Sequence, residues 1–207
     1  MTETRVERKE RTRRAILDAA LDLSQERALV ALSLRQVAKE VGIVPTAFYR
    51  HFDSIDALGL ALVEESFATL REMLRDVRRQ GTAEAGDMID SSVAVLVDHV
   101  RRRDRHFAFI ARERFAGPPA VRAEIDRNIE IFERELATDL AHQPVVGEWS
   151  DADLRTLANL IVSVLVVTTE SLVKTGSASS EERALVDQAR TQLRMLLIGA
   201  LGWKSRP

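Results

Sequence analysis

Residues 32–52 read LSLRQVAKEVGIVPTAFYRHF, and this stretch predicts two short helices that meet at a glycine. Ser33 is placed to cap the first helix, because its hydroxyl can accept a hydrogen bond from a backbone N–H group one turn later. Gly42 stands where that helix must end, since glycine adopts the left-handed backbone conformation at little cost. Pro45 suits the first turn of the second helix, where a missing N–H group costs nothing.

The second helix of this pair has an apolar side and a polar side. Phe48 and Phe52 are four residues apart, so both should face the core, whereas Tyr49 and Arg50 should face solvent. A helix, a glycine and a helix form a weak signal alone, and an ordinary helical hairpin is the competing interpretation. Together, the cap at Ser33, the turn at Gly42 and the exposed polar side chains of the second helix favour a helix-turn-helix. In that motif the second helix enters the major groove of DNA.

The residues of this segment that should contact DNA fall into two groups, those that contact phosphates and those that can also contact bases. Thr46, Tyr49 and His51 should contact phosphates. Arg35 and Arg50 should reach either phosphate or a guanine edge. The complete candidate set is Ser33, Arg35, Val44, Pro45, Thr46, Ala47, Tyr49, Arg50 and His51.

Composition limits the remaining possibilities. The 207 residues are 45% hydrophobic and 30% charged, which describes a soluble globular chain, and sparse glycine and proline favour an all-α architecture. The absence of cysteine excludes disulfides, thiolate zinc sites and cysteine nucleophiles. The four histidines lack metal-ligand spacing, and no nucleophile elbow or phosphate-binding glycine loop is present. We therefore expect no enzyme, metal or cofactor and, without a signal peptide or a membrane-length apolar run, a cytoplasmic protein.

Charge is distributed unevenly along the chain. The whole sequence has a net charge of −2, which by itself argues against DNA binding. Residues 1–52, however, hold ten Lys and Arg against seven Asp and Glu, a net of +3, and the remainder holds twenty against twenty-five, a net of −5. The basic part is the part that carries the predicted helix-turn-helix, as phosphate contact requires.

The segment from Lys9 to Leu62 resembles the TetR family of bacterial one-component transcription regulators. The resemblance is carried by TRRAILDAALDL (12–23), by residues 32–52 and by LGLAL (58–62). One departure is Ile55, which stands where the family commonly has a phosphate-contacting lysine. The resemblance implies an all-α fold of about nine helices, with a DNA-binding domain at residues 1–52 and a ligand-binding and dimerisation domain at 53–207.

Shorter segments are similar to one subgroup of this family, the repressors of fatty-acid desaturation and unsaturated fatty-acid synthesis. These segments are GIVPTAFYRHF (42–52), LGLALVEES (58–66), RERFAG (112–117) and QLRMLLIGALGW (192–203). The similarity implies an effector such as acyl-CoA or another long-chain acyl ligand, whose binding would shift the tilt of the helix after residue 53. Arg112 and Arg114 are candidates to meet its polar head, with salt bridges as the competing interpretation.

The effector pocket should be lined by apolar side chains from the middle helices. For each of these residues an ordinary core position is the competing interpretation. Besides Arg112 and Arg114, the predicted lining consists of Phe67, Leu70, Leu74, Val93, Leu96, Val97, Phe107, Ile110, Phe115, Ile129, Phe132, Leu160, Val164 and Thr168.

Residues 157–173, LANLIVSVLVVTTESLV, are apolar nearly all round. A helix of this kind is buried on every side, either inside a monomer or partly against another subunit. With residues 185–201 it should form a four-helix contact with the same pair of a second subunit, as in TetR-like homodimers. The sequence thus predicts a homodimeric repressor that binds double-stranded operator DNA and a hydrophobic effector. The competing functions are a repressor of an efflux or catabolic operon that senses an unrelated hydrophobic compound, a helical lipid carrier and an α-helical enzyme.

Overall fold

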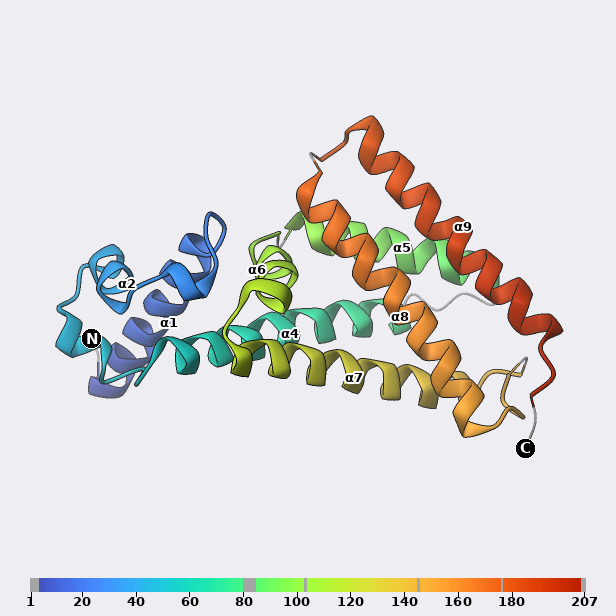
Figure 1. Cartoon of the computed structure of the whole chain (residues 1–207), viewed down its shortest axis with the longest axis horizontal. Coiled ribbons are helices and arrows are strands. Elements are labelled where there is room, and N and C mark those ends of the chain that lie inside the picture. The colour runs from blue at the N-terminus through green and yellow to red at the C-terminus, as the bar shows by residue number, and fades with distance from the viewer. Residues whose placement is uncertain (1–3, 80–84, 103, 145, 176, 206–207) are drawn as a thin grey trace. The chain divides into compact units, whose positions relative to one another are not determined.

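The computed structural model describes residues 4–79, 85–102, 104–144, 146–175 and 177–205, with the backbone alone at 73–74, 76–79, 85–87 and 104. Throughout this part of the chain all regular structure is helical, which confirms the predicted all-α fold of about nine helices (Figure 1). The elements are α1 (Arg5–Leu23), the 3-10 turn η1 (Leu29–Ala31), α2 (Leu34–Val41), α3 (Pro45–Phe48), α4 (Ile55–Arg79), α5 (Ala85–Arg102), α6 (Asp104–Ala116), α7 (Pro119–Ala141), α8 (Asp151–Lys174) and α9 (Ser180–Gly202).

The helices are grouped into two compact units. The first unit contains Met1–Thr69 and Arg105–Ile125, and the second contains Leu70–Asp104 and Asp126–Pro207. The first unit therefore holds the predicted helix-turn-helix together with the start of α4, most of α6 and the start of α7. Both α4 and α7 have residues in each unit. The functional boundary at residue 52 stays a prediction.

The core of the first unit lies under α1, α2 and α3. Ile16 and Ala20 of α1 and Val37 and Ala38 of α2 are fully buried, so α1 packs on α2. Leu29 and Leu32, in and just after η1, are also buried in this core. In α4, a Cβ added at Gly59 would lie 2.7 Å from Val121 Cγ2 and 2.8 Å from Leu29 Cδ1, so glycine permits a close approach there.

The second unit is built around α8 and α9, which run side by side, with α5 packed on both (Figure 1). Its core includes Leu154, Leu157 and Ala158 of α8 and Ala200 of α9. Ser150 and Ser179 cap these two helices, accepting from the N–H groups of Asp153 (3.3 Å) and Glu182 (3.0 Å).

By length and composition, α8 is the one helix in the described residues that could cross a membrane. The sequence was expected to contain no apolar run of that length, and this expectation was wrong for α8. A single helix of this kind is weak evidence of a membrane protein, because helices that pack against other helices have the same composition.

Glu113 of α6 is a buried carboxylate that the sequence did not indicate. Its side chain is fully buried in the first unit, where Oε1 accepts a hydrogen bond from the N–H group of Leu29 at 3.0 Å. Oε2 is buried without a hydrogen-bond partner among the described residues. Burial raises the pKa of Glu113, against the opposing effects of the Leu29 hydrogen bond and of Arg112. Glu113 therefore links α6 to η1 through a hydrogen bond, and its burial disfavours the charged form of the carboxyl group.

The raised pKa of Glu113 predicts a loss of stability as the pH increases. A carboxyl group that binds its proton more tightly in the folded chain than in the unfolded one stabilises the fold at low pH, and that contribution is lost as the pH rises through the folded-state pKa. Glu113→Gln is neutral at every pH and keeps an acceptor for Leu29. The melting temperature of the wild type should therefore fall relative to that of Glu113→Gln between about pH 5 and about pH 8. Parallel melting curves across this range would contradict the assignment.

Candidate nucleic-acid interface

The predicted cap of α2 is confirmed by two reciprocal hydrogen bonds. Ser33 Oγ accepts from the N–H group of Gln36 at 3.2 Å, and Gln36 Oε1 accepts from the N–H group of Ser33 at 2.9 Å. This capping box satisfies two backbone donors that the helix itself leaves unpaired. Ser33 remains exposed, and its contact with DNA stays a prediction.

The turn between α2 and α3 has the predicted backbone conformation. Gly42 adopts a left-handed conformation with φ 73° and ψ 29°. The N–H group of Gly42 donates to the carbonyl of Lys39 (3.1 Å), and that of Ile43 donates to the carbonyl of Ala38 (2.9 Å), which ends the helix sharply. Pro45 then occupies the first turn of α3, as expected.

The α3 helix is shorter than the predicted recognition helix, which was expected to continue towards Phe52. Regular helix ends at Phe48, and the next residues form tighter turns in which Arg50 donates to the Ala47 carbonyl and His51 to the Phe48 carbonyl. Both predicted core aromatics are buried, with ring centroids 5.9 Å apart. The two rings therefore anchor a short helix that has few hydrogen bonds of its own.

The predicted DNA contacts lie at the surface of the first unit to different degrees. Tyr49 is 54% exposed, with its ring edge-on to Phe48, and Val44 is 63% exposed. Ala47 and His51 are half-buried. The remaining exposed members of the set are Ser33, Arg35, Pro45, Thr46 and Arg50. A polar and basic surface on a helix-turn-helix can contact phosphates and base edges, although each individual contact stays a prediction.

His51 lies among cations at the end of this segment. Its Nδ1 atom is buried and has no hydrogen-bond partner among the described residues. Burial lowers the pKa of His51, and the nearby Lys9 and Arg13 lower it further. Arg13 is held close to this point, because its guanidinium carbon lies 4.5 Å from the centroid of the Phe52 ring. A phosphate group placed here would be attracted by the cations and would favour the protonated imidazole.

If His51 contacts a phosphate, DNA binding should depend on pH. The phosphate would raise the lowered pKa of His51, so that binding takes up a proton and the affinity rises as the pH falls. Between about pH 8 and about pH 6, one group can contribute up to roughly tenfold per pH unit. Affinities of the wild type and of His51→Gln for one duplex should therefore diverge towards low pH. Equal pH slopes would remove His51 from the phosphate contacts.

Tyr49 provides the most direct test of the interface, because its exposed side chain is not needed to fill the core. Tyr49→Ala should weaken binding to the specific duplex by at least about tenfold, the effect of losing one strong polar contact. Tyr49→Phe keeps the ring and should reproduce most of the loss if the hydroxyl binds phosphate. Anisotropy titrations measure the affinity, and sedimentation checks that the oligomeric state is unchanged. An unchanged affinity of Tyr49→Ala would exclude Tyr49 from the interface.

The predicted effector residues divide between the two compact units. In the first unit, Phe67 and Phe107 are buried and Ile110 is half-buried, whereas Phe115 is 66% exposed. In the second unit, Leu160 is 44% exposed. The other predicted effector residues in the second unit are the buried Val93, Leu96 and Thr168, and the half-buried Leu70, Val97, Ile129, Phe132 and Val164. The side chain of Leu74 lies outside the described part of the chain. The role of this set in ligand binding stays a prediction.

The two candidate arginines for the polar head of an effector have contacts within the first unit. Arg112 donates to the backbone carbonyl of Gln25 at 2.7 Å, and Arg114 lies with its guanidinium carbon 5.5 Å from the centroid of the Phe115 ring. The competing interpretation was that Arg112 forms a salt bridge with a carboxylate. The observed partner of Arg112 is instead the backbone carbonyl of Gln25. Arg112 thus joins Glu113 in linking α6 to the segment between α1 and α2.

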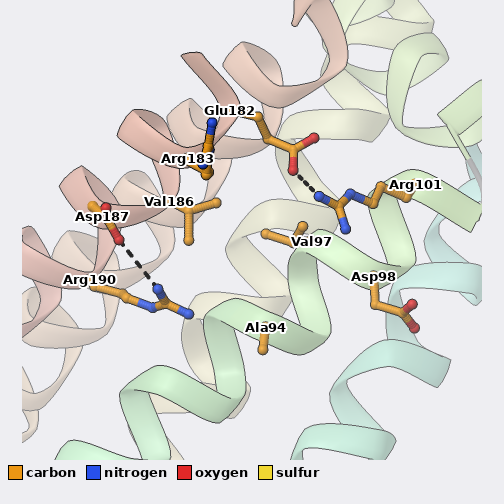
Figure 2. Close-up of a pocket in the computed structure, with 9 residues that line it drawn as sticks. All are labelled: Ala94, Val97, Asp98, Arg101, Glu182, Arg183, Val186, Asp187 and Arg190. Carbon is orange, nitrogen blue, oxygen red and sulfur yellow. Dashed lines mark hydrogen bonds and ion pairs between the residues drawn. The ribbon is translucent and has the colours of Figure 1, made fainter. Parts of the chain in front are cut away.

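A groove of about 410 Å³ lies between α5 and α9 of the second unit (Figure 2). Val97 belongs to the predicted effector set and points across the groove towards Val186. The sequence did not indicate Arg101 and Glu182, which form an ion pair at one end of the groove. The separation of 81 residues between these two side chains explains why no local signal revealed the pair.

Comparison with known proteins agrees with this geometry. Residues 16–62 match the model of the bacterial regulatory proteins of the tetR family. A protein assigned to the TetR family from Mesorhizobium loti is 17% identical in sequence and similar over 95% of this chain and 98% of its own, with a TM-score of 0.70. The fatty acid degradation regulator FadR from Bacillus halodurans is 15% identical and is covered over the full length of both chains, with a TM-score of 0.69.

A third solved structure is FadR from Bacillus subtilis in complex with stearoyl-CoA. It is 17% identical, the similarity covers 89% of this chain and 97% of that one, and the TM-score is 0.68. Identities at this level establish a shared fold. Residues 16–62 thus match the tetR family of bacterial regulatory proteins, and the chain as a whole shares the all-helical fold of these solved regulators.

Proposed function

We propose that this protein is a cytoplasmic, ligand-responsive repressor that binds double-stranded operator DNA through α2 and α3. The observation that supports DNA binding best is the exposure of Tyr49 and Arg50 on a helix-turn-helix. That motif has the capped first helix, the left-handed glycine turn and the buried aromatic rings expected of it. Thr46, Tyr49 and His51 would contact phosphates, and Arg35 and Arg50 would contact phosphate or guanine. A repressor of this kind acts by occupying its operator.

The effector that we propose is acyl-CoA or another long-chain acyl ligand, and the regulated genes are those of fatty-acid desaturation or lipid metabolism. Two observations support this class. The segments at 42–52, 58–66, 112–117 and 192–203 are similar to desaturation repressors, and the fold is shared with FadR proteins, one of which binds stearoyl-CoA.

The response to the effector would be transmitted within the first unit by the contacts of α6. Glu113 and Arg112 bind the backbone at Leu29 and Gln25, next to the helix-turn-helix. At the other end of α6, His106 Nδ1 lies 3.1 Å from Ser66 Oγ of α4. A ligand that favours one position of α4 or α6 would therefore shift the population of the arrangement that binds DNA.

We also propose a homodimer that forms through α8 and α9. Several large apolar side chains of these helices are exposed in the single chain: Leu160, Val167, Met195, Ile198 and Leu201. Apolar side chains gathered on two adjacent helices indicate a protein contact, and a two-fold pairing of the same helices would cover them. Such a contact would also account for the apolar composition of α8.

Ile198→Glu tests this contact, because Ile198 is 68% exposed and its replacement removes nothing from the core. A charge buried between two subunits should shift the protein to monomers, as measured by sedimentation equilibrium, and should lower its affinity for a two-half-site operator by at least about a hundredfold. Glu130→Ala, an exposed position on α7, provides a control. A dimer that persists unchanged in Ile198→Glu would place the subunit contact elsewhere.

The proposed function is tested by fluorescence anisotropy with DNA from the region upstream of the gene. Binding is measured at two salt concentrations, against scrambled DNA, with and without saturated and unsaturated acyl-CoA. We expect binding that prefers the upstream DNA, weakens with salt through loss of phosphate contacts, and shifts on addition of acyl-CoA.

The remaining outcomes distinguish the competing functions. Specific binding that ignores both acyl-CoA species would retain the repressor but exclude this effector, and would favour control of an efflux or catabolic operon. Binding of acyl ligands without any preference over scrambled DNA would favour a helical lipid carrier.

A further inference from the structure

The helices α5 and α9 of the second unit are joined by ion pairs at two points and leave a groove between them. At one end, Arg101 of α5 pairs with Glu182 of α9. At the other end, Asp90 of α5 pairs with Arg190 at 3.3 Å and with Arg194 at 2.8 Å. Between these ends the two helices do not close on each other, which leaves the open volume of about 410 Å³.

The groove has an apolar strip within a largely charged lining. The charged side chains that line it are Asp98, Arg101, Glu182, Arg183, Asp187 and Arg190. Val97 of α5 and Val186 of α9 point towards one another across it, and the small Ala94 leaves space beside them (Figure 2). The guanidinium groups of Arg101 and Arg190 lie at opposite ends of this apolar strip. A volume of several hundred Å³ is that of a small-molecule site. An apolar strip with an arginine at its end suits a ligand that has an apolar chain and an anionic head.

A second cavity, of about 110 Å³, adjoins the groove at the Arg101–Glu182 pair. It shares Val97 and both members of the pair with the groove, and it is otherwise lined by apolar or small side chains of α5, α8 and the segment before α9: Val100, Leu172, Val173, Thr175 and Ser177. The ion pair therefore lines both the groove and the smaller cavity.

The two partners of this pair differ in their surroundings. The Glu182 side chain is 6% exposed, and its Oε2 atom also accepts from the N–H group of Ala178 at 3.1 Å. The hydrogen bond from Arg101 lowers the pKa of Glu182, so Glu182 is a carboxylate at neutral pH. Arg101 is 46% exposed and lines the groove. A guanidinium group has donors for two carboxylates, so Arg101 can bind an anion from the groove while it contacts Glu182 or in place of it.

We propose that this groove is the site of an anionic amphiphile, a molecule with an apolar chain and a carboxylate end. The carboxylate would bind Arg101, and the chain would lie over Ala94, Val97 and Val186. Displacement of Glu182 from Arg101 would let the ligand extend into the smaller cavity. The inference rests on the proposed function and deepens it: among long-chain acyl ligands it selects those with a free carboxylate, rather than acyl-CoA, and assigns them to the space between α5 and α9.

The first test measures where the ligand binds. Dodecanoate, below its micelle concentration, is titrated calorimetrically into the full-length wild type and two alanine-to-tryptophan variants. Ala94→Trp fills the groove and should lower the affinity by at least about tenfold. Ala152→Trp makes the same change at an exposed position of α8 outside the groove and should bind as the wild type does. Failure of the wild type to bind dodecanoate, or an unchanged affinity of Ala94→Trp, would overturn the proposal.

The second test measures whether Arg101 binds the carboxylate. Arg101→Gln should lower the affinity for dodecanoate about tenfold but leave that for dodecanol unchanged, because the alcohol has no charge to lose. Arg155→Gln, which removes an exposed arginine of α8 outside the groove, is the matched control. Glu182→Gln removes the competing carboxylate and should raise the affinity for dodecanoate. Equal affinities for the two probes in every variant would contradict a role for Arg101.

DNA binding separates this inference from the proposed function. Ala94→Trp should bind the specific duplex as the wild type does, but dodecanoate should no longer alter that binding. If the wild type binds no specific DNA, the proposed function fails. The calorimetric titrations would still show whether the groove binds dodecanoate. If dodecanoate alters DNA binding equally in the wild type and Ala94→Trp, the function stands and the groove is not the effector site.

Discussion

The left-handed turn at Gly42 is the constraint on which the arrangement of the helix-turn-helix depends. It ends α2 after eight residues and redirects the chain, so that Phe48 and Phe52 reach the core and Tyr49 remains outside. The α3 helix is too short to be stable by itself, since a single turn has few internal hydrogen bonds. Its orientation is therefore set by the turn before it and by the two buried rings. That orientation leaves the polar side chains of α3 and of the residues after it exposed.

Within the first unit, polar groups link the helix-turn-helix to α6. Glu113 reaches Leu29 and Arg112 reaches Gln25, so α6 holds the backbone that leads from α1 into α2. A buried carboxyl group with one oxygen that has no hydrogen-bond partner is costly to the fold. In the proposed mechanism, these contacts make the position of the helix-turn-helix depend on the position of α6. Such sensitivity is what a regulator requires and a purely structural domain does not.

The local features could be predicted from the sequence because each has a local cause. Ser33, Gly42 and Pro45 act on their own backbone, so their effects on α2 and α3 follow from the local sequence. The short length of α3, the burial of Glu113 and the ion pair of Arg101 with Glu182 could not be predicted. The contacts of Glu113 and Arg101 join residues more than eighty positions apart, and side-chain packing rather than periodicity decides them.

The central claim is that two copies of this helix-turn-helix recognise one defined DNA sequence. Selection of bound duplexes from a random library by the purified full-length protein tests this claim most directly. The proposed dimer predicts a single enriched consensus with two-fold symmetry, whose half-sites are spaced by about one helical turn of roughly 10 base pairs or by a multiple of it. A library that remains unenriched after repeated selection, or a consensus without symmetry, would contradict the claim.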